Sequence, residues 1–217
     1  AELDDIVKAR QTSRKLRKAN DVKTVAFVGY TNAGKSTTIN SLISKYRGDM
    51  EKCVFVKDML FATLETSTRS IKLPNNKEFL ITDTVGFVSK LPHYLVESFK
   101  STLEEITEAS LIVHIIDSTS PYMKLQIETT NKVLAELGVK NIPILYAFNK
   151  VDLLPNKMFI DANLSPFVNL SNKTNEGFDE LCDFIEKSLF PDIVNAKFLL
   201  PYNRGDIYNA LKEKAEV

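Results

Sequence analysis

Short apolar runs alternate with amphipathic segments over most of the chain, and this alternation restricts the fold more than any other feature. The runs are TVAFVG (24–29), FLITDT (79–84), LIVHIID (111–117), IPILYAFN (142–149) and FVNLS (167–171). Runs rich in β-branched and aromatic residues are typical of strands buried on both faces of a parallel sheet. Helical patterns lie between these runs, near 35–46, 93–109, 122–138 and 175–189. The sequence therefore predicts an α/β fold.

One segment interrupts the alternation. In RSIKLPNNKEFLIT (69–82), the turn residues Pro74, Asn75 and Asn76 separate two strand-like stretches. Such a turn predicts a hairpin of two antiparallel strands. We therefore expect a mixed, mostly parallel, six-stranded sheet with helices on both faces.

The 217 residues divide into three parts. Residues 1–20 read as a polar helix, interpreted as the end of a helical linker, with a basic patch that touches RNA as the alternative. Residues 21–190 form the predicted domain. Residues 191–217 offer one strand and one short helix, too little for a core, and are expected to begin an extension that is cut short. The first residue is Ala1, which suggests a fragment or a processed chain.

The composition limits the partners and the compartment. The chain has 28 Lys and Arg against 28 Asp and Glu, so bulk charge does not favour nucleic acid or anionic lipid. Cys53 and Cys182 form no C-x-x-C pair and are interpreted as reduced thiols. No apolar run reaches the length of a membrane span. We expect a cytoplasmic protein, and a monomer.

The stretch VAFVGYTNAGKSTT (25–38) contains Gly29-x-x-x-x-Gly34-Lys35-Ser36, between a predicted strand and a predicted helix. This is the pattern of a phosphate-binding loop, in which backbone N–H groups hold phosphates. Lys35 is expected to reach the β and γ phosphates, and the Ser36 hydroxyl to bind Mg²⁺. The predicted nucleotide contacts in this loop are Gly29, Tyr30, Thr31, Asn32, Ala33, Gly34, Lys35, Ser36 and Thr37.

Two further loops favour guanine as the base. In YAFNKVD (146–152), Asp152 can accept hydrogen bonds that guanine offers and adenine does not, while the stem of Lys150 can cover the ring. Asn149 completes this motif. In NLSNKTNEG (169–177) the expected contacts are Ser171, Asn172 and Lys173, although Asn172 replaces the usual alanine. The alternative interpretation is a P-loop enzyme that uses ATP, and such an enzyme needs neither of these two loops.

The stretch LITDTVGF (80–87) adds a D-x-x-G arrangement after another strand. Asp83 is expected to hold a Mg²⁺-bound water, and the Gly86 N–H to meet the γ phosphate.

Together, GYTNAGKST, DMLFATLETSTRSI, TDTVGFVSKLPHYLVESFKSTLEE and NKVDLL resemble the GTPase domain of the HflX family, in the Obg-HflX group of translation-factor-related GTPases. The resemblance covers about residues 10–217. It implies a Ras-like P-loop GTPase fold, GTP hydrolysis to GDP with Mg²⁺, and association with the large ribosomal subunit, where the family splits stalled ribosomes. Members of the family also carry an N-terminal domain that makes much of the ribosome contact, and this sequence is expected to lack that domain.

The resemblance places the first switch at about 47–70. Thr63, Thr66 and Thr68 are its candidate Mg²⁺ ligands, with Thr63 chosen first and Thr68 second. The predicted metal ligands are thus Ser36, Thr63 and Asp83, and the predicted catalytic residues are Lys35, Thr63 and Gly86.

Two residues bear on the rate of hydrolysis. Phe87 stands where Ras-like enzymes often place the glutamine that orients water, so slow turnover is expected. Asn32 resembles the asparagine that helps hold K⁺ in GTPases without that glutamine, which suggests K⁺ stimulation. Tolerance of a tight turn explains Asn32 equally well. A nucleotide-gated binding module with negligible hydrolysis, or another Obg-like ribosome-assembly GTPase, remains the alternative function.

Both histidines are predicted to have structural rather than catalytic roles. His114 lies inside an apolar strand and is expected to be a hydrogen-bonded core residue. His93 is expected to lie at the surface or to cap a helix.

Overall fold

The computed structural model describes residues 22–45, 67–73, 77–83, 106–156, 163–191, 197 and 199–214. None of the helices in this described part is long and apolar enough to cross a membrane.

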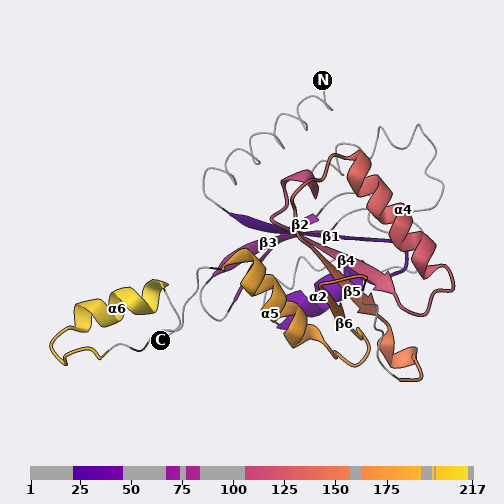
Figure 1. The fold of residues 1–217 in the computed structure, drawn as a ribbon. Helices are drawn as coiled ribbons and strands as arrows, with labels where there is room; N and C mark the ends of the chain where they lie inside the picture. Colours follow the sequence, from indigo (N-terminus) through magenta and orange to yellow (C-terminus); the bar gives the residue numbers. More distant parts are fainter. Residues whose placement is uncertain are drawn as a thin grey trace.

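A six-stranded sheet forms the centre of the structure (Figure 1), in the order β2-β3-β1-β4-β5-β6. Strands β1, β3, β4, β5 and β6 run parallel, and β2 is the antiparallel edge strand. The mixed sheet expected from the sequence is thus confirmed. The strand bounds are Lys23–Gly29 (β1), Ser67–Lys72 (β2), Glu78–Asp83 (β3), Leu111–Asp117 (β4), Ile144–Asn149 (β5) and Phe167–Asn169 (β6).

The predicted hairpin joins β2 to β3. Its register pairs Ser67 with Asp83 and Lys72 with Glu78, and the Leu73 N–H donates to the Lys77 carbonyl at 2.8 Å just before the turn. The turn residues 74–76 lie outside the described residues.

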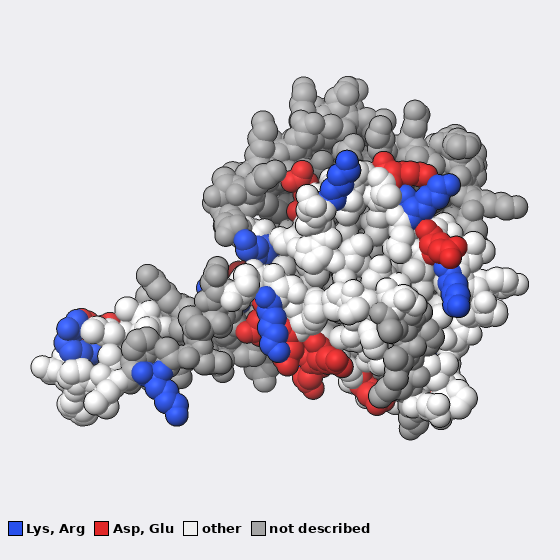
Figure 2. All heavy atoms as spheres, in the orientation of Figure 1, with Lys and Arg blue, Asp and Glu red and all other residues white. Residues whose placement is uncertain are grey.

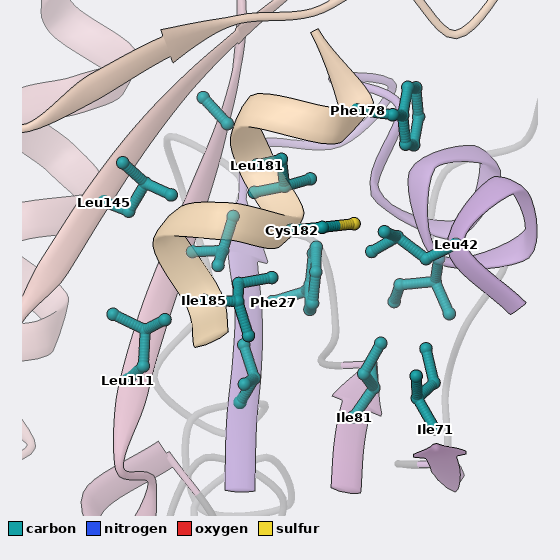
Figure 3. Close-up of a cluster of buried hydrophobic side chains, with 14 of the residues drawn as sticks. Phe27, Leu42, Ile71, Ile81, Leu111, Leu145, Phe178, Leu181, Cys182 and Ile185 are labelled. Atoms are coloured by element: carbon teal, nitrogen blue, oxygen red, sulfur yellow. The ribbon is translucent and has the colours of Figure 1, made fainter. Parts of the chain in front are cut away.

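Helices cover both faces of the sheet because successive side chains of a strand point to opposite faces. Val25 and Phe27 of β1 belong to the larger core cluster, which α2 (Lys35–Lys45) and α5 (Phe178–Leu189) close. Figure 3 shows this cluster, with Leu42 of α2 and Ile185 of α5 near Phe27. Ala26 and Val28 point the other way, into a second cluster closed by α4 (Met123–Glu136).

The helix starting near 175 was predicted three residues too early. Helix α5 begins at Phe178 because Gly177 before it has a left-handed backbone, with φ of 79°. An added Cβ there would lie 1.8 Å from the Asn169 carbonyl oxygen, so the position favours glycine.

The C-terminal part differs from the expectation. Helix α6 (Gly205–Lys214) forms as predicted and lies away from the sheet (Figure 1). The predicted strand before it is wrong for the described residues 199–204, which contain none. Leu199 and Tyr202 there are fully exposed, so no described element buries these two side chains. Of the helix predicted at 93–109, the described part contains the short 3₁₀ helix Ile106–Glu108.

Candidate functional site

The predicted site residues that the structure describes lie at or just after the carboxyl ends of parallel strands, which meet at one edge of the sheet. Strand β1 is flanked by β3 on one side and β4 on the other, so the chain order reverses around it. Ligands of open α/β sheets bind at such a switch point, outside the carboxyl ends of the strands. The loop after β1 leaves the sheet there and enters α2 at Lys35.

The two glycines of this loop are required by close packing. Gly29 has φ of 147°, and an added Cβ would lie 2.2 Å from the Ile115 carbonyl oxygen of β4. Gly34 has φ of 99°, and its Cβ would lie 2.2 Å from Asn149 Nδ2. Both backbones adopt conformations that side chains rarely tolerate, so the loop can wrap tightly over the end of β1.

Lys35 is held inside this loop. Its Nζ donates to the carbonyl oxygens of Gly29 at 3.0 Å and Tyr30 at 3.1 Å, and the side chain is buried. Burial lowers the pKa of Lys35 to about 8, although the carboxylate of Asp83 partly opposes the shift. An anion placed in the loop would favour the charged ammonium group.

Ser36 and Asp83 lie side by side. Ser36 Oγ donates to Asp83 Oδ2 at 3.0 Å, across 47 residues of sequence. Asp83 is fully buried at the end of β3. A hydroxyl and a carboxylate at this spacing supply the hard oxygen ligands that Mg²⁺ prefers, so the donor set fits the ion.

Two of the predicted base-side residues, Asn149 and Asn172, are hydrogen-bonded directly to the phosphate loop. Asn149, at the end of β5, donates from Nδ2 to the Ala33 carbonyl at 2.8 Å. The Asn172 N–H donates to Asn149 Oδ1 at 3.3 Å, and Asn172 Nδ2 donates to the Gly34 carbonyl at 3.2 Å. The structure therefore brings together three loops that lie far apart in the sequence. Ala33 and Asn149, for example, are 116 residues apart.

Asp152 is oriented by a neighbouring loop. Ser171 Oγ donates to Asp152 Oδ1 at 2.7 Å and accepts from the Thr174 N–H at 3.1 Å. This arrangement fixes one carboxylate oxygen and leaves the rest of the carboxylate to bind elsewhere.

The sequence interpretation missed Asp117. This residue ends β4, and its Oδ2 accepts from Lys150 Nζ at 2.6 Å, while Thr119 donates to Oδ1. Burial opposes ionisation of Asp117, but the hydrogen bonds from Lys150 and Thr119 outweigh it and lower its pKa. Lys150 has a left-handed backbone with φ of 66°. The signal in the sequence was the carboxylate that ends the apolar run LIVHIID, and the structure places β4 beside β5, which Lys150 follows directly.

The other predicted residues are placed as follows. Thr68, the second choice for Mg²⁺, lies in β2 opposite Thr82. Asn32 is exposed with φ of 61°. Thr63, Thr66, Gly86, Phe87 and His93 lie outside the described residues, as does Cys53. Thr31 lies within the phosphate loop and Thr37 lies in α2, and both are half-buried, whereas Lys173 is exposed.

His114 is buried in β4, as expected, but its predicted hydrogen bond is not confirmed. Nδ1 is buried without a hydrogen-bond partner among the described residues. The ring lies 5.7 Å from that of Tyr146. Burial, helped by the positive charge of Lys35, lowers the pKa of His114 to about 3. The imidazole is therefore neutral near pH 7.

The sheet order and the loop around Lys35 define a nucleotide-binding domain of the P-loop class. A family model described as "50S ribosome-binding GTPase" matches residues 24–150. The chain belongs to this family.

The relatives agree with this assignment. The chain is 43% identical over 215 residues to the GTPase HflX of Caldanaerobacter subterraneus subsp. tengcongensis, covering 99% of this chain and 48% of that protein. It is 41% identical over 223 residues to the GTPase HflX of Akkermansia muciniphila, covering 100% of this chain and 49% of that protein. The resemblance to HflX GTPases is thus confirmed, and the chain spans about half the length of these relatives.

A solved structure agrees with the fold. The GTP-binding protein of Sulfolobus solfataricus, in complex with GDP, superposes with a TM-score of 0.62 at 24% identity, covering 85% of this chain and 58% of that one. The predicted Ras-like P-loop fold is confirmed.

Proposed function

We propose that the chain binds GTP and GDP at the edge of the sheet after β1 and hydrolyses GTP with Mg²⁺. The observation that carries this proposal is the hydrogen bond from Asn149 Nδ2 to the Ala33 carbonyl, because it joins the base-side motif to the phosphate loop in one site. The nucleotide contacts are the residues predicted from the sequence, from Gly29 to Thr37 and at the two base-side loops.

Guanine would be recognised by Asp152. Its carboxylate, positioned by Ser171 at 2.7 Å, would accept from the two N–H groups on one edge of guanine. The Asn172 N–H would donate to the base oxygen. Lys150, held by Asp117, would lay its methylene stem along the ring.

Mg²⁺ would be held by Ser36 Oγ and, through water, by the Asp83 carboxylate, together with phosphate oxygens. When bound, the ion would neutralise charge that develops on the transferred phosphoryl group. Lys35 would neutralise the β and γ phosphates from the other side. Thr63, as a further Mg²⁺ ligand, and the Gly86 N–H, at the γ phosphate, remain part of the proposal, with K⁺ as a second cation near Asn32.

We place this activity on the large ribosomal subunit, in a cytoplasmic, monomeric protein. The family description and the HflX relatives support a nucleotide switch that acts on ribosomes. Residues 21–190 would form the GTPase domain, with 1–20 as the end of a linker and 191–217 as the start of an extension. In the second candidate function the chain is a nucleotide-gated binding module, and hydrolysis only resets it.

Turnover measurements test the proposal and separate the two functions. Single- and multiple-turnover rates of GTP hydrolysis would be compared with and without large ribosomal subunits. Stimulation by the subunits favours the nucleotide-gated module, whereas a fast rate without them favours a free-standing enzyme. The control is Lys35→Ala, which should abolish hydrolysis without unfolding the domain. A folded Lys35→Ala protein that hydrolyses GTP at the unaltered rate would refute the assignment of the site.

A further inference from the structure

We infer that Asn172 is a positioning residue whose side chain locks the base-side loop (residues 171–174) to the phosphate loop, so that tight guanine binding depends on this amide. The inference rests on the proposed nucleotide binding and adds a role that the usual alanine at this position has no atoms to perform.

The Asn172 amide spans the gap between the loops with both of its ends. Nδ2 donates to the Gly34 carbonyl at 3.2 Å, and Oδ1 accepts from Thr38 Oγ1 at 3.0 Å. Gly34 ends the phosphate loop, and Thr38 lies in the first turn of α2. One side chain is therefore fixed to two consecutive parts of the phosphate-binding element.

Thr38 makes this link sensitive to change. Its hydroxyl also approaches the Gly34 carbonyl at 2.9 Å, so one proton lies between two acceptors. The side chain is fully buried. Loss of the Asn172 side chain would leave this hydroxyl with the Gly34 carbonyl alone, whereas loss of the hydroxyl would remove the donor to Asn172 Oδ1.

The space for the link is created by the absence of a side chain at Gly34. A Cβ there would lie 2.2 Å from Asn149 Nδ2 and 2.9 Å from Asn172 Nδ2. The two amides therefore pack against the open side of one glycine. The hydrogen bond from the Asn172 side chain to the Gly34 carbonyl fixes the position of the Asn172 backbone N–H. This N–H donates to Asn149 Oδ1 at 3.3 Å and is the group proposed to meet the guanine oxygen.

The test compares a ligand that uses both loops with one that uses only the phosphate loop. The first readout is the release rate of a fluorescent GDP, and the second is the inhibition constant of inorganic tripolyphosphate. Asn172→Ala and Thr38→Val should each speed GDP release about five- to tenfold. Because they remove the same interaction, the double variant should be little faster than the faster single variant. Tripolyphosphate should bind all variants within about twofold, since it contacts no base-side group.

Two further variants separate positioning from loss of packing. Thr38→Ser keeps the hydroxyl and should release GDP at close to the unaltered rate. Thr130→Val removes a hydroxyl that is equally buried, in α4, and has no hydrogen-bond partner in the described part of the chain. It should leave GDP release unchanged.

Unchanged GDP release in Asn172→Ala and Thr38→Val would overturn the inference. Equal weakening of GDP and tripolyphosphate would also overturn it, because the pair would then only shape the phosphate loop. If the unaltered chain fails to bind GDP, the proposed function itself is refuted, and this inference is refuted as well.

Discussion

At the scale of single residues, the site depends on a few groups that neighbouring loops hold in place. Ser171 occupies one lone pair of the Asp152 carboxylate, and the Asp117 carboxylate holds the Lys150 ammonium group. In both cases a residue proposed to touch the base is oriented by a residue from another loop. A site of this kind loses selectivity when one orienting or accepting group changes, because the remaining buried polar groups lose their partners.

Replacement of Asp152 tests the recognition of guanine. In Asp152→Asn the amide N–H₂ faces the N–H groups of guanine, whereas the 2-oxo group of xanthine can accept from it. GDP affinity should fall about a hundredfold or more, and xanthosine diphosphate should bind better than GDP. Fluorescence titration with both nucleotides measures the change. Asp183→Asn, an exposed carboxylate on α5, serves as the control. An Asp152→Asn protein that still prefers GDP would remove Asp152 from the base site.

Asn32 has two compatible explanations at the same scale. Its φ of 61° agrees with a residue that tolerates a tight turn, and its exposed amide is free to face an ion beside bound phosphates. If it holds K⁺, the ion would offset charge that develops in the transition state.

Turnover in different salts tests the role of Asn32. GTP hydrolysis should be at least about tenfold faster in K⁺ than in Na⁺ at equal ionic strength. Asn32→Gly is the appropriate variant because glycine keeps the positive φ while it removes the amide. It should abolish the difference between the salts. Equal rates for the unaltered chain, or K⁺ stimulation that survives in Asn32→Gly, would contradict the hypothesis.

At the scale of elements, β4 carries an unusual buried base. The pKa of His114 is lowered to about 3, chiefly by burial, from an ordinary value of 6.5. In the unfolded chain the imidazole takes up a proton below pH 6.5, but in the folded chain it does so only near pH 3. The unfolded state therefore binds more protons in this window, and stability must fall as the pH falls through it.

The variant His114→Leu isolates this effect. Between pH 7 and pH 4.5 the free energy of unfolding of the unaltered chain should fall more steeply than that of the variant, by up to about 1.4 kcal/mol per pH unit. Urea unfolding at each pH measures the free energy of unfolding of both proteins. The carboxylates contribute equally to both, so the difference between the two pH curves reports His114 alone. Parallel curves would show that His114 is not neutral in the folded state.

The elements themselves were largely predictable. The run LIVHIID matches β4 residue for residue, and the hairpin of β2 and β3 follows from the turn residues between them. Apolar period and turn chemistry are local properties, so the sequence displays them directly. The strand expected before α6 is wrong for residues 199–204, since a strand needs a hydrogen-bonded partner and none of the described strands pairs with this stretch.

The side-chain links across loops were not predictable in the same way. Asn172 and Thr38 are 134 residues apart, and Asp117 and Lys150 are 33 apart. No local pattern connects such pairs, because the sheet order brings them together. Sequence motifs identified Asn172 as a base-side residue but gave no sign that its side chain would reach the phosphate loop.

At the scale of the whole molecule, charge contributes little to partner choice. Lys and Arg side chains lie beside Asp and Glu side chains on the face shown in Figure 2, in agreement with the balanced composition. Recognition of a polyanion must therefore be local, at the phosphate loop, where Lys35 and the backbone N–H groups supply the positive potential. In the proposed function, base specificity would then decide which nucleotide the chain binds.

The most direct test of the central claim is one titration of the unaltered chain with fluorescent GDP and fluorescent ADP in Mg²⁺ buffer. Guanine recognition by a buried, oriented carboxylate predicts that GDP binds at least about a thousandfold more tightly than ADP, since adenine leaves Asp152 without its hydrogen bonds. ADP binding within about tenfold of GDP would contradict the account, because such a small ratio corresponds to at most about 1.4 kcal/mol of discrimination.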